Sequence, residues 1–195
     1  MLPRMLFALL LTSAGLLNAQ SKNLDIYWID VEGGASTLIV SPSGESMLID
    51  TGWTVGDRDA KRIYAATQQA GLKKIDYLLI SHFHADHVGG LAALSKMIPI
   101  GRFFDHGDDI EKENQQWLDS YRTASAGKRT IVKPGDEIPL KGIQAVVVSS
   151  NEKVLPVTIS SMALLFPTIR DRRCVPPVPG STPRFTSGRP ILPAS

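Results

Sequence analysis

A chain of 195 residues with 43% hydrophobic and 21% charged side chains has the composition of one ordinary globular domain. The net charge of +2 is uneven, because residues 1–152 carry 15 basic and 18 acidic side chains whereas residues 153–195 carry 6 basic and 1 acidic. The body has no basic run interleaved with aromatic residues, so we expect no nucleic-acid surface. The single cysteine, Cys174, excludes an internal disulfide and a cysteine-rich metal cluster.

The N-terminus has the pattern of a secretory signal peptide. Arg4 supplies a positive charge, an apolar stretch runs over residues 5–17, and Leu17-Asn18-Ala19 is a small-residue site with cleavage expected after Ala19. A membrane-spanning helix needs about 20 apolar residues, and this run is shorter. We expect residues 1–19 to be a signal peptide, with export to a bacterial periplasm or beyond and no membrane attachment after cleavage. A retained anchor is the alternative.

Strand-like and helix-like segments then alternate along the body. Apolar runs separated by glycine-rich or proline-containing turns predict three strands in an antiparallel meander, at residues 24–29, 36–40 and 46–50. Further along the chain the patterns predict a helix at 57–70, a doubly buried strand at 75–80, a helix at 90–97, a strand at 102–105, a helix at 111–124 and a strand at 143–149. This alternation favours sheets covered by helices.

Three of the four histidines lie in residues 82–87, shortly after the apolar run at residues 75–80. His82 and His84 are two residues apart, so an extended backbone points both imidazoles to one side. Asp86 and His87 follow at the start of a glycine-marked turn, which can aim them at the same place. Imidazole and carboxylate together suit zinc, iron or manganese. Solvated turn residues are the alternative, and this tight order disfavours it.

The string His82-x-His84-x-Asp86-His87 resembles the signature of the metallo-β-lactamase fold superfamily of metallohydrolases. Residues 29–37, residues 48–52 and residues 75–81 resemble the strands and turns that precede that signature. The likeness covers about residues 24–150 and is greatest to the branch that includes the hydrolase-like domain of bacterial DNA-uptake channel proteins. It implies an α/β fold, the αββα sandwich, of which the N-terminal half is present and the C-terminal half is missing or degraded.

The resemblance also implies roles for the residues of the site. His82 and His84 would hold a first metal ion and Asp86 and His87 a second, and Asp86 would also orient the attacking water. Asp50 would accept a hydrogen bond from a ligand imidazole, although an Asp-Thr-Gly turn explains it equally well. We expect the metal to be zinc, which lowers the pKa of bound water to about 7. An intact member of the family would hold two zinc ions, and we expect fewer or none in this chain. Iron or manganese is less favoured.

The chain departs from the family after the signature. The resemblance calls for a further histidine, a bridging aspartate and a last histidine, and the only histidine after His87 is His106. That residue is a possible ligand or a turn-capping residue. Residues 153–195 hold 8 of the 13 prolines, and residues 175–193 lack strand or helix periodicity, so we expect a disordered tail after an incomplete domain at 20–152.

Two interpretations of the tail and two of the function follow. The tail is a translation from a shifted reading frame that begins soon after Asn151, or else a genuine proline-rich linker or partner-binding segment. The protein is an exported metal-dependent hydrolase that uses metal-bound hydroxide on an ester, amide or phosphodiester, or a catalytically inactive fragment without the downstream ligands. The sequence indicates neither the substrate, small molecule or polymer, nor the oligomeric state.

Overall fold

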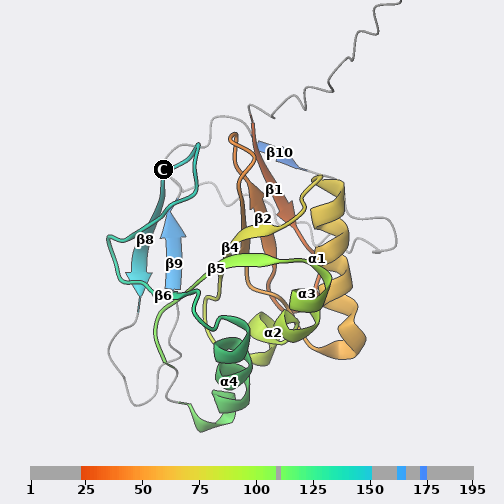
Figure 1. The fold of residues 1–195 in the computed structure, drawn as a ribbon, viewed down its shortest axis with the longest axis vertical. Helices are drawn as coiled ribbons and strands as arrows, with labels where there is room; N and C mark the ends of the chain where they lie inside the picture. The colour runs from red at the N-terminus through yellow and green to blue at the C-terminus, as the bar shows by residue number, and fades with distance from the viewer. Residues whose placement is uncertain (1–22, 109–110, 151–161, 166–171, 175–195) are drawn as a thin grey trace, which may run out of the picture.

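The computed structural model describes residues 23–108, 111–150, 162–165 and 172–174, which form two sheets and their covering helices (Figure 1). The large sheet has seven strands, in the spatial order β10 (Arg172–Cys174), β1 (Leu24–Trp28), β2 (Thr37–Val40), β3 (Ser46–Ile49), β4 (Ile75–Leu79), β5 (Ile100–Asp105) and β6 (Arg129–Ile131). The small sheet has the order β7 (Glu137–Ile138), β8 (Ala145–Ser150) and β9 (Met162–Leu165). The helices are α1 (Arg58–Gln69), α2 (Ala85–Val88), α3 (Leu91–Met97) and α4 (Gln115–Ala124), with 3-10 turns η1 (Val55–Asp57) and η2 (Lys112–Asn114).

The large sheet changes from antiparallel to parallel pairing at β3. Strands β1, β2 and β3 form the antiparallel meander that the sequence predicts, with Leu38 opposite Leu48. From β3 to β6 every neighbouring pair is parallel. The carboxyl ends of β3, β4 and β5 therefore meet at one edge, which is where ligand sites form in parallel sheets. Asp50, Ser81 and His106 follow these ends closely.

Alternating side chains of the central strands divide the core into two parts. One part joins the sheet to α1, α3 and α4, and its buried members include Leu38, Leu48, Ile63, Leu78, Leu94, Leu118 and Tyr121. The other part joins the large sheet to the small one, and its buried members include Ile39, Met47, Leu79, Phe104, Ala145 and Val147. Strand β4 contributes Leu78 to one part and Leu79 to the other, which confirms the prediction that this strand is buried on both faces.

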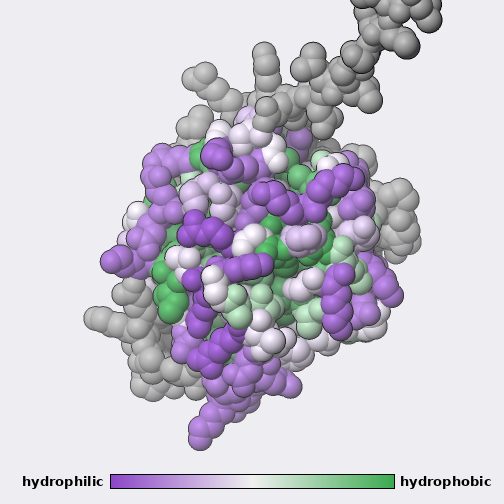
Figure 2. Space-filling view, in the orientation of Figure 1, coloured by the Kyte–Doolittle hydropathy of each residue, from purple (hydrophilic) through white to green (hydrophobic). Residues whose placement is uncertain are grey.

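The surface of the described part is mostly polar. On the face shown in Figure 2, hydrophilic residues surround a smaller hydrophobic area near the middle. Four large apolar side chains are more than two-fifths exposed, and each comes from a different element: Trp28, Val55, Ile131 and Val148. None of the helices among the described residues is long and apolar enough to cross a membrane.

Several predictions about secondary structure need correction. The expected helix at 111–124 begins as η2 and becomes α-helical at Gln115, and β5 starts at Ile100. The sequence patterns missed α2, β6 and β7, which have four, three and two residues. The tail was expected to be disordered, whereas residues 162–165 and 172–174 form strands that pair with β8 and β1. An apolar run such as Met162–Leu165 can complete a backbone ladder without the alternation used to recognise strands. The predicted signal peptide, the predicted frame change near Asn151 and the rest of the tail lie outside the described residues.

Candidate metal centre

The histidine-rich segment, residues 82–87, follows the carboxyl end of β4. His82 and His84 belong to the extended stretch after the strand, and Asp86 and His87 lie in the short helix α2. The ring centroid of His82 is 4.6 Å from that of His84 and 3.8 Å from that of His87. Asp86 Oδ2 is 3.5 Å from His87 Nε2. The structure therefore brings the four predicted ligand residues into one cluster.

Asp50 joins the end of β3 to this cluster. The residue is buried and adopts a left-handed backbone with φ of 59°, a conformation that is uncommon for residues other than glycine. Its Oδ1 accepts a hydrogen bond from the Ser81 backbone N–H at 2.7 Å. Its Oδ2 accepts from the Ser81 hydroxyl at 2.7 Å and lies 2.8 Å from His87 Nδ1. The hydrogen bond to an imidazole that the sequence predicts for Asp50 is present, and a role toward a bound ion stays a prediction.

The Ser81 hydroxyl determines the proton positions on two of the rings. Its one proton is donated to Asp50, so it is an acceptor for His82 Nδ1 at 3.1 Å and for His87 Nδ1 at 3.2 Å. An imidazole that donates its Nδ1–H keeps the lone pair of a neutral ring on Nε2. His82 and His87 therefore have Nε2 left for a ligand.

The third ring is held from the other side of the site. His84 Nε2 lies 3.0 Å from Oε2 of Glu111, a residue in the loop before η2. The same oxygen accepts a hydrogen bond from the side-chain amide of Asn114 at 2.8 Å. Each imidazole of the cluster thus has one nitrogen bound to a protein partner, an arrangement that orients the rings of metal sites.

The charges of the cluster act differently on two of its histidines. Burial lowers the pKa of His82 to about 4, and the neighbouring His87 and His84 add to this, so the ring is neutral at pH 7. Burial also acts to lower the pKa of His87, but the hydrogen bond and charge of Asp50 and the charge of Asp86 outweigh it and raise the pKa. A neutral imidazole is the form that binds metals, and His82 already has it.

Backbone hydrogen bonds fix the segment against two neighbouring loops. The carbonyl of Asp86 accepts from the Ala35 N–H at 3.0 Å, and a Cβ at Gly34 would collide with the same carbonyl oxygen. The carbonyl of His87 accepts from the backbone N–H and the hydroxyl of Thr51. The Gly33-Gly34 turn and the Asp50-Thr51-Gly52 segment, both singled out in the sequence, therefore position the backbone of the ligand residues.

The donor chemistry of this cluster fits a transition metal, but the number of donors is short. No group of three or more histidine, cysteine, aspartate or glutamate side chains in the described part of the chain is arranged to hold an ion. The buried ring of His106 packs against Phe83, with ring centroids 5.5 Å apart. Its role as a possible ligand stays a prediction. Within the described residues, the cluster by itself is not a complete set of metal ligands.

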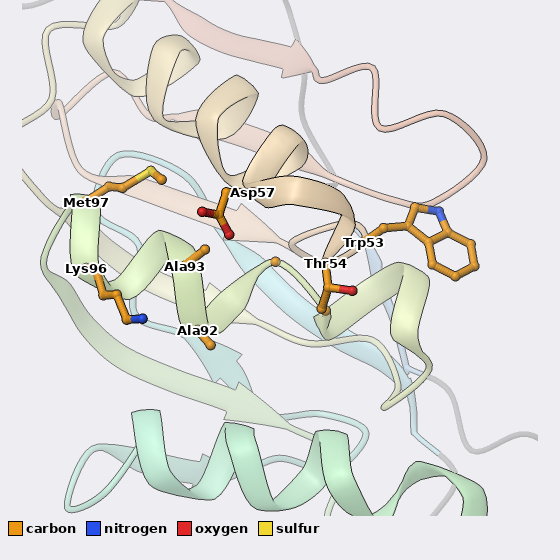
Figure 3. A pocket seen from close by; sticks show the side chains of 9 residues that line it. Trp53, Thr54, Asp57, Ala92, Ala93, Lys96 and Met97 are labelled. Carbon is orange, nitrogen blue, oxygen red and sulfur yellow. The ribbon is translucent and has the colours of Figure 1, made fainter.

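A cavity of about 220 Å³ lies next to the cluster, between the loop after β3 and helix α3 (Figure 3). Its lining residues are Trp53, Thr54, Asp57, Gly89, Gly90, Ala92, Ala93, Lys96 and Met97. None of the four predicted ligand residues lines this cavity. The cavity is therefore separate from the cluster, although Gly89 and Gly90 follow His87 closely.

The sequence patterns did not identify Ser81 or Glu111 as residues of the site. A hydroxyl residue directly before the first histidine was a possible signal for Ser81, because a neighbour in the chain is placed beside the ring. No comparable signal existed for Glu111, which is 27 residues from His84. Its contact depends on how the loop before α4 folds back over the cluster.

Comparison with known proteins gives the family. The model of the metallo-beta-lactamase superfamily matches residues 29–158, close to the range expected from the sequence motifs. The chain belongs to the metallo-beta-lactamase superfamily. The superfamily assignment and the mixed α/β fold predicted from the sequence are thereby confirmed.

Individual relatives of this superfamily chain are similar over limited regions. Integrator complex subunit 11 of Danio rerio is 36% identical over 69 residues, which are 33% of this chain and 12% of that protein. A UPF0173 metal-dependent hydrolase of Cupriavidus metallidurans is 34% identical over 71 residues, which are 36% of this chain and 22% of that protein. The chain thus spans less than a quarter of these curated relatives.

Solved metallo-beta-lactamases share the fold at low sequence identity. Rm3 metallo-beta-lactamase has a TM-score of 0.53 and 18% identity, covering 75% of this chain and 55% of that one. MEM-A1, a subclass B3 enzyme isolated from a soil metagenome library, has a TM-score of 0.51 and 18% identity, covering 76% and 58%. The chain therefore spans just over half of these structures, as the expectation of an incomplete sandwich requires.

Proposed function

We propose that this chain is an exported metal-dependent hydrolase whose ion is held in part by His82, His84, Asp86 and His87. The observation that carries the proposal is the set of hydrogen bonds behind the rings, because Asp50, Ser81 and Glu111 each take one imidazole nitrogen and leave the other. Zinc is the proposed metal, since this donor set suits it and superfamily members that the chain resembles include a metal-dependent hydrolase. The family resemblance calls for further ligands, and the sequence holds no histidine after His106 to supply them.

The proposed reaction is hydrolysis of an ester, amide or phosphodiester. Zinc at such a site supplies a nucleophilic hydroxide near neutral pH. Asp86 is the proposed catalytic residue, because its carboxylate lies beside the His87 ring and is partly exposed, where it can orient a water molecule. The names of the relatives do not favour one bond, since they include a metal-dependent hydrolase and a thioesterase. The substrate is a small molecule or a polymer, and no nucleic-acid surface is proposed.

A catalytically inactive chain is the second candidate, and one observation favours it. In the part of the chain that the structure describes, no three donor side chains are arranged around a common point for an ion. If His82 and His84 hold one ion and Asp86 and His87 hold another, each ion has only two protein ligands. This candidate predicts weak zinc binding or none, and no turnover.

Zinc content and turnover separate the two candidates in one set of samples. The mature full chain is purified, its zinc is measured by mass spectrometry, and hydrolysis of a chromogenic ester, anilide and phosphodiester is followed. A hydrolase retains zinc and loses both zinc and turnover in His82→Ala, whereas Asp119→Asn, a change at an exposed carboxylate, has no effect. Wild-type protein that retains little or no zinc and hydrolyses none of these substrates supports the inactive candidate and overturns the proposed metal site.

Export is proposed from the first 19 residues and is tested separately. Expression of the full chain in a bacterial host should give a periplasmic product whose N-terminus follows Ala19. The intact mass of the purified protein measures this directly. A product that retains Met1 and remains with the membrane would show the alternative, an uncleaved anchor.

A further inference from the structure

Glu111 occupies a position in the site that the sequence motifs do not assign. It lies in the connection between β5 and α4 and directly precedes η2. Its Oε2 is 3.0 Å from His84 Nε2 and 2.8 Å from the Asn114 side-chain nitrogen, while its own carbonyl accepts the Asn114 backbone N–H at 3.1 Å. Asn114 therefore holds both the backbone and the carboxylate of Glu111, and the carboxylate contacts His84.

The chemistry of this contact fixes a proton. An ionised carboxylate only accepts hydrogen bonds, so the hydrogen between the two side chains belongs to His84 Nε2. A neutral imidazole has one N–H and one lone pair, which places the lone pair of His84 on Nδ1. His82 and His87 are held through Nδ1, so His84 presents the opposite ring nitrogen from its two neighbours.

The contact is anchored more firmly than an ordinary surface ion pair. The side chains of His84 and Glu111 are 30% and 33% exposed, so their electrostatic attraction alone contributes little. Asn114, in contrast, is buried and leads directly into α4, which packs into the core through Leu118 and Tyr121. The position of the Glu111 carboxylate is therefore determined by the packing of a helix, as an orienting partner requires.

We propose that Glu111, held by Asn114, is a positioning residue that selects Nδ1 as the nitrogen that His84 offers to a ligand. The consequence for metal binding rests on the proposed function, whereas the state of the ring does not. Without Glu111 the ring can rotate and offer either nitrogen. With it, the geometry of the third imidazole is set before any ion binds.

The first arm of the test uses the metal-free full chain with 15N-labelled histidine. In wild-type protein the Nε2 proton of His84 should give an NMR signal that is protected from exchange with solvent, assigned by its loss in His84→Ala. Glu111→Ala should lose this signal. Glu111→Gln should retain it, because the amide oxygen can still accept from both donors. Glu113→Ala, which removes an equal charge from an exposed neighbouring position, should also retain it.

Two results of this NMR experiment would overturn the positioning role of Glu111. If Glu111→Ala keeps the protected proton, another group holds the ring. If Glu113→Ala loses it as well, the effect is a general one of charge or folding. Circular dichroism spectra that match wild type establish that each variant is folded before its NMR spectrum is compared.

The second arm measures zinc affinity by competition with a chelator. Loss of a hydrogen-bond partner behind a ligand histidine weakens metal binding by roughly 10- to 100-fold, and this is expected for Glu111→Ala. Glu111→Gln should stay within a few-fold of wild type, as should Glu113→Ala. An equal loss in the alanine and glutamine variants would make the effect one of charge and overturn the proposal. Wild-type protein that binds no zinc would refute the proposed function, and the first arm would still decide the role of Glu111.

Discussion

Asp105 is a buried carboxylate at the end of β5, and replacing it should destabilise the fold strongly. Its Oδ1 accepts hydrogen bonds from Arg129 and the Gly107 N–H, both at 2.8 Å. Its Oδ2 accepts from Arg129 at 2.8 Å and from the Tyr121 hydroxyl at 2.9 Å. Asp105→Ala removes all four acceptor contacts. A buried tyrosine hydroxyl and a guanidinium then lose their carboxylate partner.

The expected magnitude follows from the burial of the three side chains. Removing one partner of a buried ion pair costs about 3–5 kcal/mol. Arg129 is one-fifth exposed and keeps an ion pair with Asp108 at 3.0 Å, so the lower figure of about 3 kcal/mol applies. In a domain of this size each kcal/mol shifts Tm by about 2–4 °C, which gives a fall of roughly 6–12 °C.

Thermal unfolding followed by far-ultraviolet circular dichroism measures the effect. Asp119→Ala is the matched control, because this aspartate is 67% exposed and pairs with Arg122 on the same helix. A surface pair of this kind contributes about 0.5 kcal/mol or less, so Tm should fall by no more than about 2 °C. If Asp105→Ala lowers Tm no more than Asp119→Ala does, the network around Asp105 does not stabilise the fold and the reasoning is refuted.

Three further predictions concern other positions. Burial acts to raise the pKa of Glu45, but hydrogen bonds from Lys141 and its charge outweigh burial and lower this pKa. Wild type should therefore have a higher Tm than Glu45→Gln at neutral pH, and the difference should disappear as acid protonates the carboxylate. A difference in Tm that does not change with pH would contradict this. Gly34→Ala places a methyl group against the Asp86 carbonyl and should cost about 1–3 kcal/mol in chemical denaturation, and an unchanged midpoint would exclude the clash. Asp50→Gly and Asp50→Ala lose the same hydrogen bonds. Because the backbone at residue 50 is left-handed, with φ of 59°, the alanine variant should be less stable than the glycine variant by about 1–2 kcal/mol. Equal free energies of unfolding for the two variants would show that the backbone at Asp50 is not strained.

Local patterns predicted the first half of the fold well because its pairing partners are close in sequence. The meander of β1 to β3 needs only short turns, and Gly44 supplies the positive φ of the turn between β2 and β3. Helix α1 has its buried residues, among them Ile63 and Ala66, at helical spacing. In both cases the spacing of the apolar residues and the turn that ends the element predict the same secondary structure.

Strands defined by distant partners were not predictable in the same way. Strand β6 has only three residues, with Arg129 facing Phe103 across a parallel pair. Its residues are half-buried or exposed, so they carry no apolar alternation. The same limit applied to the candidate site, where the sequence predicted the cluster of residues 82–87 but not the contact from Glu111. A contact across 27 residues exists only after the intervening strand and loop have folded.

The orientation of the rings in this cluster can be changed without a bound ion, because the groups that hold the rings are separate from the groups that would coordinate the ion. The groups behind the rings, Asp50, Ser81 and Glu111, come from the end of β3, the end of β4 and the loop before α4. All three lie within the region that matches the superfamily and within the described fold. The proton positions on the three imidazoles are thus set by packing and hydrogen bonds that need no metal. Substitutions of Asp50, Ser81 or Glu111 should therefore alter the orientation of the rings even in metal-free protein. Gain or loss of a metal ligand should alter the affinity for the ion and leave the orientation of the rings unchanged.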